Sequence, residues 1–216
     1  MKKTINFSLW GDNPKYTIGA IKNAELANLI YPDWICRFYC GKSVPNKIVD
    51  ELKKFKNVEI VLMEEEGDWT GMFWRFYACE DSDVMISRDT DSRLNLREKF
   101  AVDEWLKSDK DFHIMRDHPY HTALILGGMW GCRNGILKDI KSLIDKYVKG
   151  DFWQVDQNFL RDKIYPLISS NSFVHDSYFN IEPHKKKFPI ERTNKEFVGD
   201  VFDENNNRHP EYYKFL

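Results

Sequence analysis

The stretch that decides the fold is Val84-Met85-Ile86-Ser87-Arg88-Asp89-Thr90-Asp91-Ser92-Arg93. It begins with a short, mostly apolar run that predicts a β-strand, and an Asp-x-Asp follows directly. Two carboxylates one residue apart at a strand end direct their oxygens toward one small volume, where unpaired charge is costly. A hard divalent cation such as Mg2+ or Mn2+ relieves that cost, and such ions commonly bridge carboxylates to a phosphate group. The motif therefore predicts a cation site beside Asp89 and Asp91.

The arginines that flank the motif, Arg88 and Arg93, suit a site for a negatively charged diphosphate. The alternative is a solvated turn in which these arginines pair with the aspartates, because an Asp-x-Asp by itself is a short and common pattern. The surrounding sequence has to distinguish the two.

Strand and helix candidates alternate along the chain on both sides of the motif. The alternation predicts one α/β domain over residues 1–216, with helices flanking a mostly parallel central sheet. The strand candidates are residues 4–9, 34–40, 58–63, 83–87 and 112–116. The helix candidates are residues 18–30, 45–55, 69–79, 96–106, 136–147 and 159–168. Residues 117–135 and the polar last third of the chain carry no clear prediction.

Composition indicates a globular protein with one core. The 216 residues are 42% hydrophobic, and a formal net charge of -2 gives no support for a nucleic-acid partner. No apolar run approaches the roughly 20 residues of a membrane span, and polar residues interrupt any signal-peptide core near the start. We therefore expect a soluble, cytoplasmic protein. Its cysteines, expected to be buried thiols because no Cys-x-x-Cys is present, are Cys36, Cys40, Cys79 and Cys132.

The loop after the first strand should share a crevice with the Asp-x-Asp, because ligands of such sheets bind beyond the carboxyl ends of the strands. This loop offers Ser8, Trp10 and Tyr16, and a nucleotide base could stack on either ring. It contains neither a P-loop nor a Gly-x-Gly-x-x-Gly fingerprint. The alternative is an ordinary strand–helix connection.

Arg75 lies in an aromatic-rich helix candidate just before the Asp-x-Asp strand. An arginine on a largely buried helix needs an anionic partner. That partner could be the Asp pair, a diphosphate, or the nearby Glu80 and Asp81. Ligand binding and a structural ion pair both remain open for this residue.

A polar cluster with adjacent glycines occupies residues 113–131. Gly127 and Gly128 permit close approach of the backbone to a ligand, and Trp130 offers a ring face to a sugar. The histidines raise the alternative of a zinc site, but their spacing matches no recognised ligand pattern and no cysteine joins them. The polar members of the cluster are His113, Arg116, Asp117, His118 and His121.

Two late positions are further candidates for chemistry. Asp156, followed by Gln157, opens a helix, where an acid is often only a cap or a dipole partner. In the crevice, however, Asp156 could accept the proton of an attacking hydroxyl. His175 follows a short apolar run and is either structural or completes a metal shell with Asp89 and Asp91.

Taken in order, these motifs resemble the GT-A class of nucleotide-sugar glycosyltransferases, and more closely the small glycosyltransferase domains of large chlorella viruses and some bacteria. The resemblance runs roughly from the first strand through His175. Besides the Asp-x-Asp stretch, it rests on Glu104-Trp105-Leu106, His113-Ile114-Met115-Arg116-Asp117 and Gly127-Gly128-Met129-Trp130-Gly131.

The resemblance implies a single Rossmann-like GT-A domain that moves a sugar from a UDP-sugar to a hydroxyl of a glycan or glycoprotein. Residues of about 1–93 would bind the nucleotide, and residues of about 94–216 the donor sugar and acceptor. Mn2+ or Mg2+ would bind Asp91, Asp89 directly or through water, and His175. The donor would contact Ser8, Trp10, Tyr16, Arg75, Arg88, Asp89, Arg93, Asp117, Gly127, Gly128 and Trp130.

The resemblance also places Asp156 and Gln157 against the reacting sugar carbon. Asp156 would be the general base of an inverting reaction, whereas Asp156 or Gln157 would stabilise the sugar cation of a retaining one. Two alternatives remain. A haloacid-dehalogenase-like phosphatase also has an Asp-x-Asp after an apolar strand, but it usually has Thr or Val where this chain has Arg93. The other alternative is a catalytically dead nucleotide- or carbohydrate-binding module.

Overall fold

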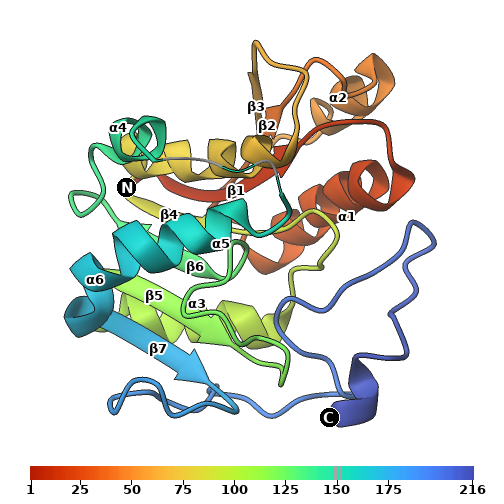
Figure 1. Ribbon diagram of the computed structural model, residues 1–216. Coiled ribbons are helices and arrows are strands. Elements are labelled where there is room, and N and C mark those ends of the chain that lie inside the picture. The colour runs from red at the N-terminus through yellow and green to blue at the C-terminus, as the bar shows by residue number, and fades with distance from the viewer. Residues whose placement is uncertain (148–149, 151) are drawn as a thin grey trace.

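The computed structural model describes residues 1–147, 150 and 152–216, and a seven-stranded sheet forms its centre (Figure 1). The strand order is β3-β2-β1-β4-β6-β5-β7. β6 pairs antiparallel with β4 and β5, and the other neighbouring strands are parallel. The expected α/β fold is therefore confirmed. The strands are β1 (Lys3–Leu9), β2 (Ile35–Cys40), β3 (Val58–Leu62), β4 (Val84–Ser87), β5 (Phe112–Arg116), β6 (Trp130–Arg133) and β7 (Ser172–Asp176).

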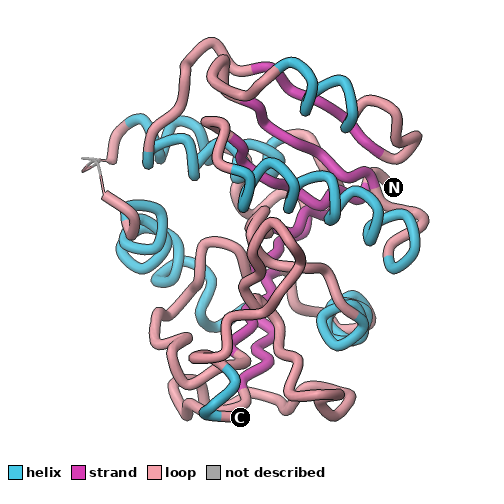
Figure 2. The backbone as a smooth tube through the Cα atoms, turned by 90° about the vertical axis from the view of Figure 1, so that its right-hand side faces the viewer, coloured by secondary structure: helices cyan, strands magenta, loops and turns pink. Residues whose placement is uncertain are grey.

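Helices cover both faces of the sheet (Figures 1 and 2). One apolar core joins β1 and β2 to α1, α2 and α3, and a second joins β4, β5 and β6 to η1, α4, α5, η2 and α6. No helix in the described part of the chain is both long and apolar enough to cross a bilayer. The helices are α1 (Pro14–Ile30), α2 (Asn46–Leu52), η1 (Trp69–Glu80), α3 (Leu96–Leu106), α4 (Ile140–Asp145), α5 (Val155–Phe159), η2 (Leu160–Ile164), α6 (Tyr165–Ile168), η3 (Ser169–Asn171) and η4 (Tyr213–Phe215).

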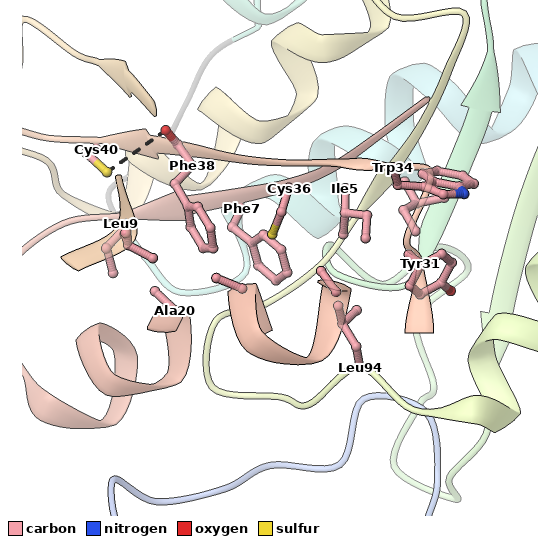
Figure 3. Packing of buried hydrophobic residues seen from close by; sticks show 14 of the residues in the cluster. Ile5, Phe7, Leu9, Ala20, Tyr31, Trp34, Cys36, Phe38, Cys40 and Leu94 are labelled. Carbon is pink, nitrogen blue, oxygen red and sulfur yellow. Dashed lines mark hydrogen bonds between the residues drawn. The ribbon is translucent and has the colours of Figure 1, made fainter. Parts of the chain in front are cut away.

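The alternating pattern of β1 builds the first core. Ile5, Phe7 and Leu9 are buried, and they point with Phe38 of β2 toward α1 (Figure 3). Phe7 stacks on Phe38 with ring centroids 4.9 Å apart. Small residues such as Ala20 line the facing side of α1, so the helix packs close to these rings.

The other face of β1 is polar although it is buried. Thr4, Asn6 and Ser8 alternate with the apolar residues and form hydrogen bonds within the fold, although Asn6 Oδ1 has no partner among the described residues. The Thr4 hydroxyl lies 2.9 Å from the Ser82 hydroxyl, and Ser8 Oγ accepts the backbone N–H of Arg75 at 3.1 Å. The second bond ties η1 to the carboxyl end of β1.

The elements differ from the sequence-based expectation at several ends. α1 begins at Pro14 rather than at residue 18, because the Asn13 side chain accepts the N–H of Lys15 at 3.0 Å and caps the helix. Residues 69–80 form a 3-10 helix, and α4 is shorter than expected. β6 had no predicted counterpart: it lies between β4 and β5, and this buried strand begins in a glycine-rich segment without clear alternation.

The segment after β7 contains little regular structure and reaches the Asp-x-Asp loop (Figure 1, blue). The N–H of Phe202 donates to the carbonyl oxygen of Asp91 at 2.8 Å, and Val201 forms an isolated bridge with Ser92. The last third of the chain therefore helps to hold the motif that precedes it by a hundred residues.

Candidate active site

A cavity of about 540 Å³ opens at the carboxyl ends of β1 and β4. The β1–α1 loop, η1, the Asp-x-Asp loop and α5 line it, and Val201 is added by the C-terminal segment. Ligands of α/β sheets bind at this edge. The residues expected at a site that do line the cavity are Ser8, Trp10, Tyr16, Arg75, Asp89, Asp91, Gly127, Asp156 and Gln157.

Hydrogen bonds from α1 hold the backbone of the Asp-x-Asp loop. The buried Asn23 amide donates to the carbonyl oxygens of Thr90 at 3.3 Å and Ser92 at 2.9 Å. Asn23 Oδ1 in turn accepts the N–H of Leu94 at 3.1 Å. A Cβ at Gly19 would overlap the Thr90 carbonyl oxygen, so glycine is needed for this close approach of the helix. The loop is therefore positioned by a helix that precedes it by some seventy residues in the chain.

Each aspartate of the motif faces a side-chain cation. Arg75 Nη1 donates to Asp89 Oδ1, and Lys15 Nζ lies 2.8 Å from Asp91 Oδ2. Burial and the charge of Asp89 raise the pKa of Asp91, and Lys15 opposes that rise. Burial alone lowers the pKa of Lys15, but the charge of Asp91 and its hydrogen bond raise it on balance. Asp-x-Asp is thus a compensated ionic cluster.

Arg75 also binds the candidate catalytic acid. Its Nη2 donates to Asp156 Oδ2 at 2.8 Å, and the other oxygen of Asp156 accepts the N–H of Gln157 at 2.8 Å. The Asp156 side chain is only 2% exposed, and burial raises its pKa although Arg75 opposes that effect. A Cβ at Gly127 would overlap the Asp156 carboxylate, so this glycine leaves space for the pair. Arg75 therefore connects Asp89 to Asp156.

Aromatic side chains form part of the cavity wall. Trp10 meets Trp69 and Trp74 edge to face, with ring centroids 6.4 Å and 6.3 Å apart. Trp69 and Trp153 line the cavity and remain 42% and 59% exposed. Such rings offer flat faces to a nucleobase or to a sugar.

His175 does not lie at the cavity, in contrast to the expectation from the resemblance. Its Nδ1 is 2.8 Å from His113 Nε2, and its Nε2 is 3.1 Å from Glu104 Oε2. Burial lowers the pKa of His175, and it lowers that of His113 still further from the ordinary value. Among the described residues, no three His, Cys, Asp or Glu side chains are grouped so that they could hold a metal ion. His175 therefore lies beside His113 and Glu104 and is not among the residues that line the cavity with Asp89 and Asp91.

Arg88 and Trp130 belong to the core rather than to the cavity. Arg88 is 1% exposed, and its Nε donates to Glu98 at 2.9 Å while Nη1 donates to the Ser87 carbonyl at 2.7 Å. Trp130 is fully buried and stacks on Phe112 with centroids 5.1 Å apart. Neither side chain, expected to contact the donor, lines the cavity, because the alternation of β4 and the unpredicted strand β6 turn them inward.

Arg93 and Asp117 are likewise absent from the cavity lining. Arg93 Nε donates to Asn206 Oδ1 of the C-terminal segment at 2.9 Å. Asp117 is fully buried between Arg97, at 2.7 Å, and Arg192, at 2.6 Å. These partners come from distant parts of the chain, so local sequence could not reveal them.

Gly128 abuts the site without lining the cavity. A Cβ at this position would overlap the Asp89 carboxylate. The backbone at Gly128 therefore closely approaches the carboxylate of Asp89, whereas a close approach to a ligand was expected.

Several residues of the cavity were not singled out from the sequence. Trp69, Met72, Trp153 and Val201 line it, and Lys15 pairs with Asp91 at its edge. The position of Lys15 beside the Asn13 cap is a signal that could have identified it, because the first turn of a helix after β1 must face the crevice. Nothing in the local sequence marks Val201.

No family model matches this sequence, and no curated protein matches it by sequence. Solved structures do match its fold. A glycosyltransferase involved in the glycosylation of the major capsid of PBCV-1 superposes with a TM-score of 0.53 at 19% identity, over 82% of both chains. Glucosyl-3-phosphoglycerate synthase from Mycobacterium tuberculosis, in complex with Mn2+, UDP-glucose and phosphoglyceric acid, superposes with a TM-score of 0.53 at 11% identity. That match covers 84% of this chain and 73% of the other.

This chain has the GT-A glycosyltransferase fold. The resemblance to viral and bacterial enzymes seen in the motifs is confirmed at the level of fold. The same synthase crystallised with phosphoglyceric acid gives the same TM-score of 0.53.

Proposed function

We propose that this protein is a glycosyltransferase that moves a sugar from a UDP-sugar to a hydroxyl of a glycan or glycoprotein, with Mn2+ or Mg2+ at Asp89 and Asp91. The observation that carries the proposal is one cavity containing the paired carboxylates, the aromatic β1 loop and the buried acid Asp156. The fold supports it, because Mn2+ and UDP-glucose are bound by one of the similar structures.

The donor set fits a hard divalent cation. Asp89 and Asp91 supply carboxylate oxygens, and their side chains are 45% and 18% exposed toward the cavity. Mg2+ and Mn2+ are commonly held by one or two carboxylates while substrate phosphates and water supply the remaining ligands. When bound, such an ion would neutralise charge on the departing diphosphate.

Residues of the chain would bind the nucleotide and carry out the transfer. Trp10 and Tyr16, on the nucleotide-binding half, would lie by the base, and Arg75 would compensate charge near the phosphates. On the other half, Asp156 would face the reacting sugar with Gln157. For an inverting reaction Asp156 takes the proton of the attacking hydroxyl, whereas for a retaining one Asp156 or Gln157 stabilises the sugar cation.

UDP binding tests the proposal directly. UDP with Mn2+ should stabilise the wild-type protein by about 2.7 kcal/mol at a concentration of about one hundred times Kd. For a chain of this size that is a rise in melting temperature of roughly 5–10 °C, measurable by differential scanning fluorimetry. Asp91→Ala should abolish the rise, whereas Asp50→Ala, at an exposed position of α2, should retain it.

Other outcomes would redirect the assignment. Absence of a shift with any nucleoside diphosphate would contradict the proposal. Release of phosphate from simple phosphoesters would favour a phosphatase, and donor binding without transfer across a broad acceptor screen would favour a catalytically dead binding module.

A further inference from the structure

Each carboxylate of the Asp-x-Asp pairs with a cationic side chain, and these two side chains differ in how tightly the protein holds them. Arg75 is 4% exposed and donates to Asp89, to Asp156 at 2.8 Å and to the Arg88 carbonyl oxygen at 3.0 Å. Three acceptors on a buried guanidinium hold it in one position.

Lys15 is held far less. Its side chain is 28% exposed, and among the described residues Asp91 is the carboxylate that pairs with it. Its Nζ also lies 5.3 Å from the centre of the Tyr16 ring. An ammonium on a flexible four-carbon chain changes partner with little rearrangement.

The charges of this cluster predict that Lys15 and a divalent cation compete for the Asp91 carboxylate. Lys15 and Arg75 face Asp89, Asp91 and Asp156, which leaves a formal charge of about minus one among five groups. A divalent cation that binds Asp91 shares its carboxylate with Lys15, whose Nζ lies 2.8 Å from Oδ2, and at such short range the cation repels the ammonium. The cation and Lys15 therefore compete until another anion accepts the lysine.

We propose that Lys15 is the resting counterion of Asp91 and becomes a phosphate ligand of the nucleotide complex. This inference rests on the proposed function, since a nucleoside diphosphate is the anion that accepts the displaced ammonium. Lys15 lies at the first turn of α1, between Asn13 and Tyr16 of the cavity wall, and its ammonium is 2.8 Å from the cavity residue Asp91. Metal and nucleotide then bind cooperatively, because the metal frees Lys15 from Asp91 and the phosphates of the nucleotide accept the freed ammonium.

Lys15→Met separates the two roles. Removing the competitor should tighten binding of Mn2+ alone by about fivefold, the equivalent of a partly exposed ion pair. Removing the phosphate ligand should weaken UDP at saturating Mn2+ by about tenfold. Free Mn2+ is measured by electron paramagnetic resonance, and UDP binding by the fluorescence of the cavity tryptophans Trp10, Trp69 and Trp153.

Two variants complete the experiment. Lys22→Met, on an exposed turn of the same helix, should leave both affinities unchanged. Lys15→Arg, which keeps the positive charge, should restore most of the UDP affinity. Melting temperatures without ligand show that each variant is folded.

The opposite signs of the two effects make the result decisive. Unchanged Mn2+ binding in Lys15→Met, or weakening of both ligands together, would overturn the inference. So would UDP binding that needs no metal in the wild type but needs Mn2+ in Lys15→Met, because Lys15 would then replace the cation rather than compete with it. If the wild-type protein binds no UDP with Mn2+, the proposed function itself fails. If the wild type binds UDP and Lys15→Met gives one of these contrary results, only the role of Lys15 is refuted.

Discussion

In the proposed reaction, Asp156 is the residue on which the chemistry depends most directly. Its carboxylate is bound by Arg75 and by the N–H of Gln157, so its position in the cavity wall is defined on both oxygens. Burial raises the pKa of Asp156, which makes its anion a stronger proton acceptor than an exposed aspartate.

Asp156→Asn retains the shape of the side chain and removes its charge. We expect kcat to fall by about 10²–10⁴-fold, as for loss of a general base, while UDP affinity changes little. Steady-state rates and UDP binding, measured separately, check this split. Asp162→Asn, on the exposed side of η2, is the matched control. A kcat within a few-fold of wild type would remove Asp156 from the reaction.

At the level of elements, the contact between α1 and the Asp-x-Asp loop matters most for the site. Asn23 forms hydrogen bonds with three backbone groups of the loop, those of Thr90, Ser92 and Leu94. This contact makes the geometry of Asp89 and Asp91 dependent on a helix.

Asn23→Ala leaves those buried backbone groups without their partner. The free energy of unfolding should decrease by about 1–3 kcal/mol, because unsatisfied buried groups pay their full desolvation cost. Mn2+-dependent UDP binding should weaken as well, since the loop is no longer held. Urea unfolding and UDP titration measure the two effects. Lys22→Ala, the exposed neighbour on α1, should show neither; normal UDP binding in Asn23→Ala would mean that the loop is positioned by other contacts.

At the level of the whole molecule, the buried pair of His113 on β5 and His175 on β7 couples stability to pH. Burial lowers the pKa of His113 well below its ordinary value of 6.5. Between the two pKa values the unfolded chain holds a proton that the folded chain excludes. The contribution of His113 to stability is therefore complete above pH 6.5 and is lost as the pH falls below that value.

We expect the unfolding free energy to decrease toward acid pH with a slope of up to about 1.4 kcal/mol per pH unit for this group. Urea unfolding from about pH 7.5 to about pH 5.5 measures the slope in the wild type and in His113→Gln. The slope should be smaller in the variant. Asp200, whose pKa burial raises to about 6, acts in the opposite direction but is present in both proteins. Equal slopes would contradict the assignment.

Much of this architecture could be predicted from local patterns. Short, mostly apolar runs identified β1, β2, β3, β4 and β5, and the helix predicted over residues 96–106 matches α3 at both ends. Strand ends then placed Asp89 and Asp91 opposite the β1 loop, and the cavity is found there. These predictions succeeded because the periodicity of a strand or helix is written in neighbouring residues.

The remainder depended on contacts between residues far apart in the chain. Sequence alone left open whether Arg75 holds a ligand or an ion pair, and the fold shows it between Asp89 and Asp156. Arg88 and His175 were expected at the site, yet distant partners bury both. Charge and hydrogen-bonding capacity are properties of a residue, whereas the partner that satisfies them is chosen by packing. Local sequence therefore located the Asp-x-Asp and the loop that faces it, and tertiary structure decided which charged side chains pair with its two carboxylates.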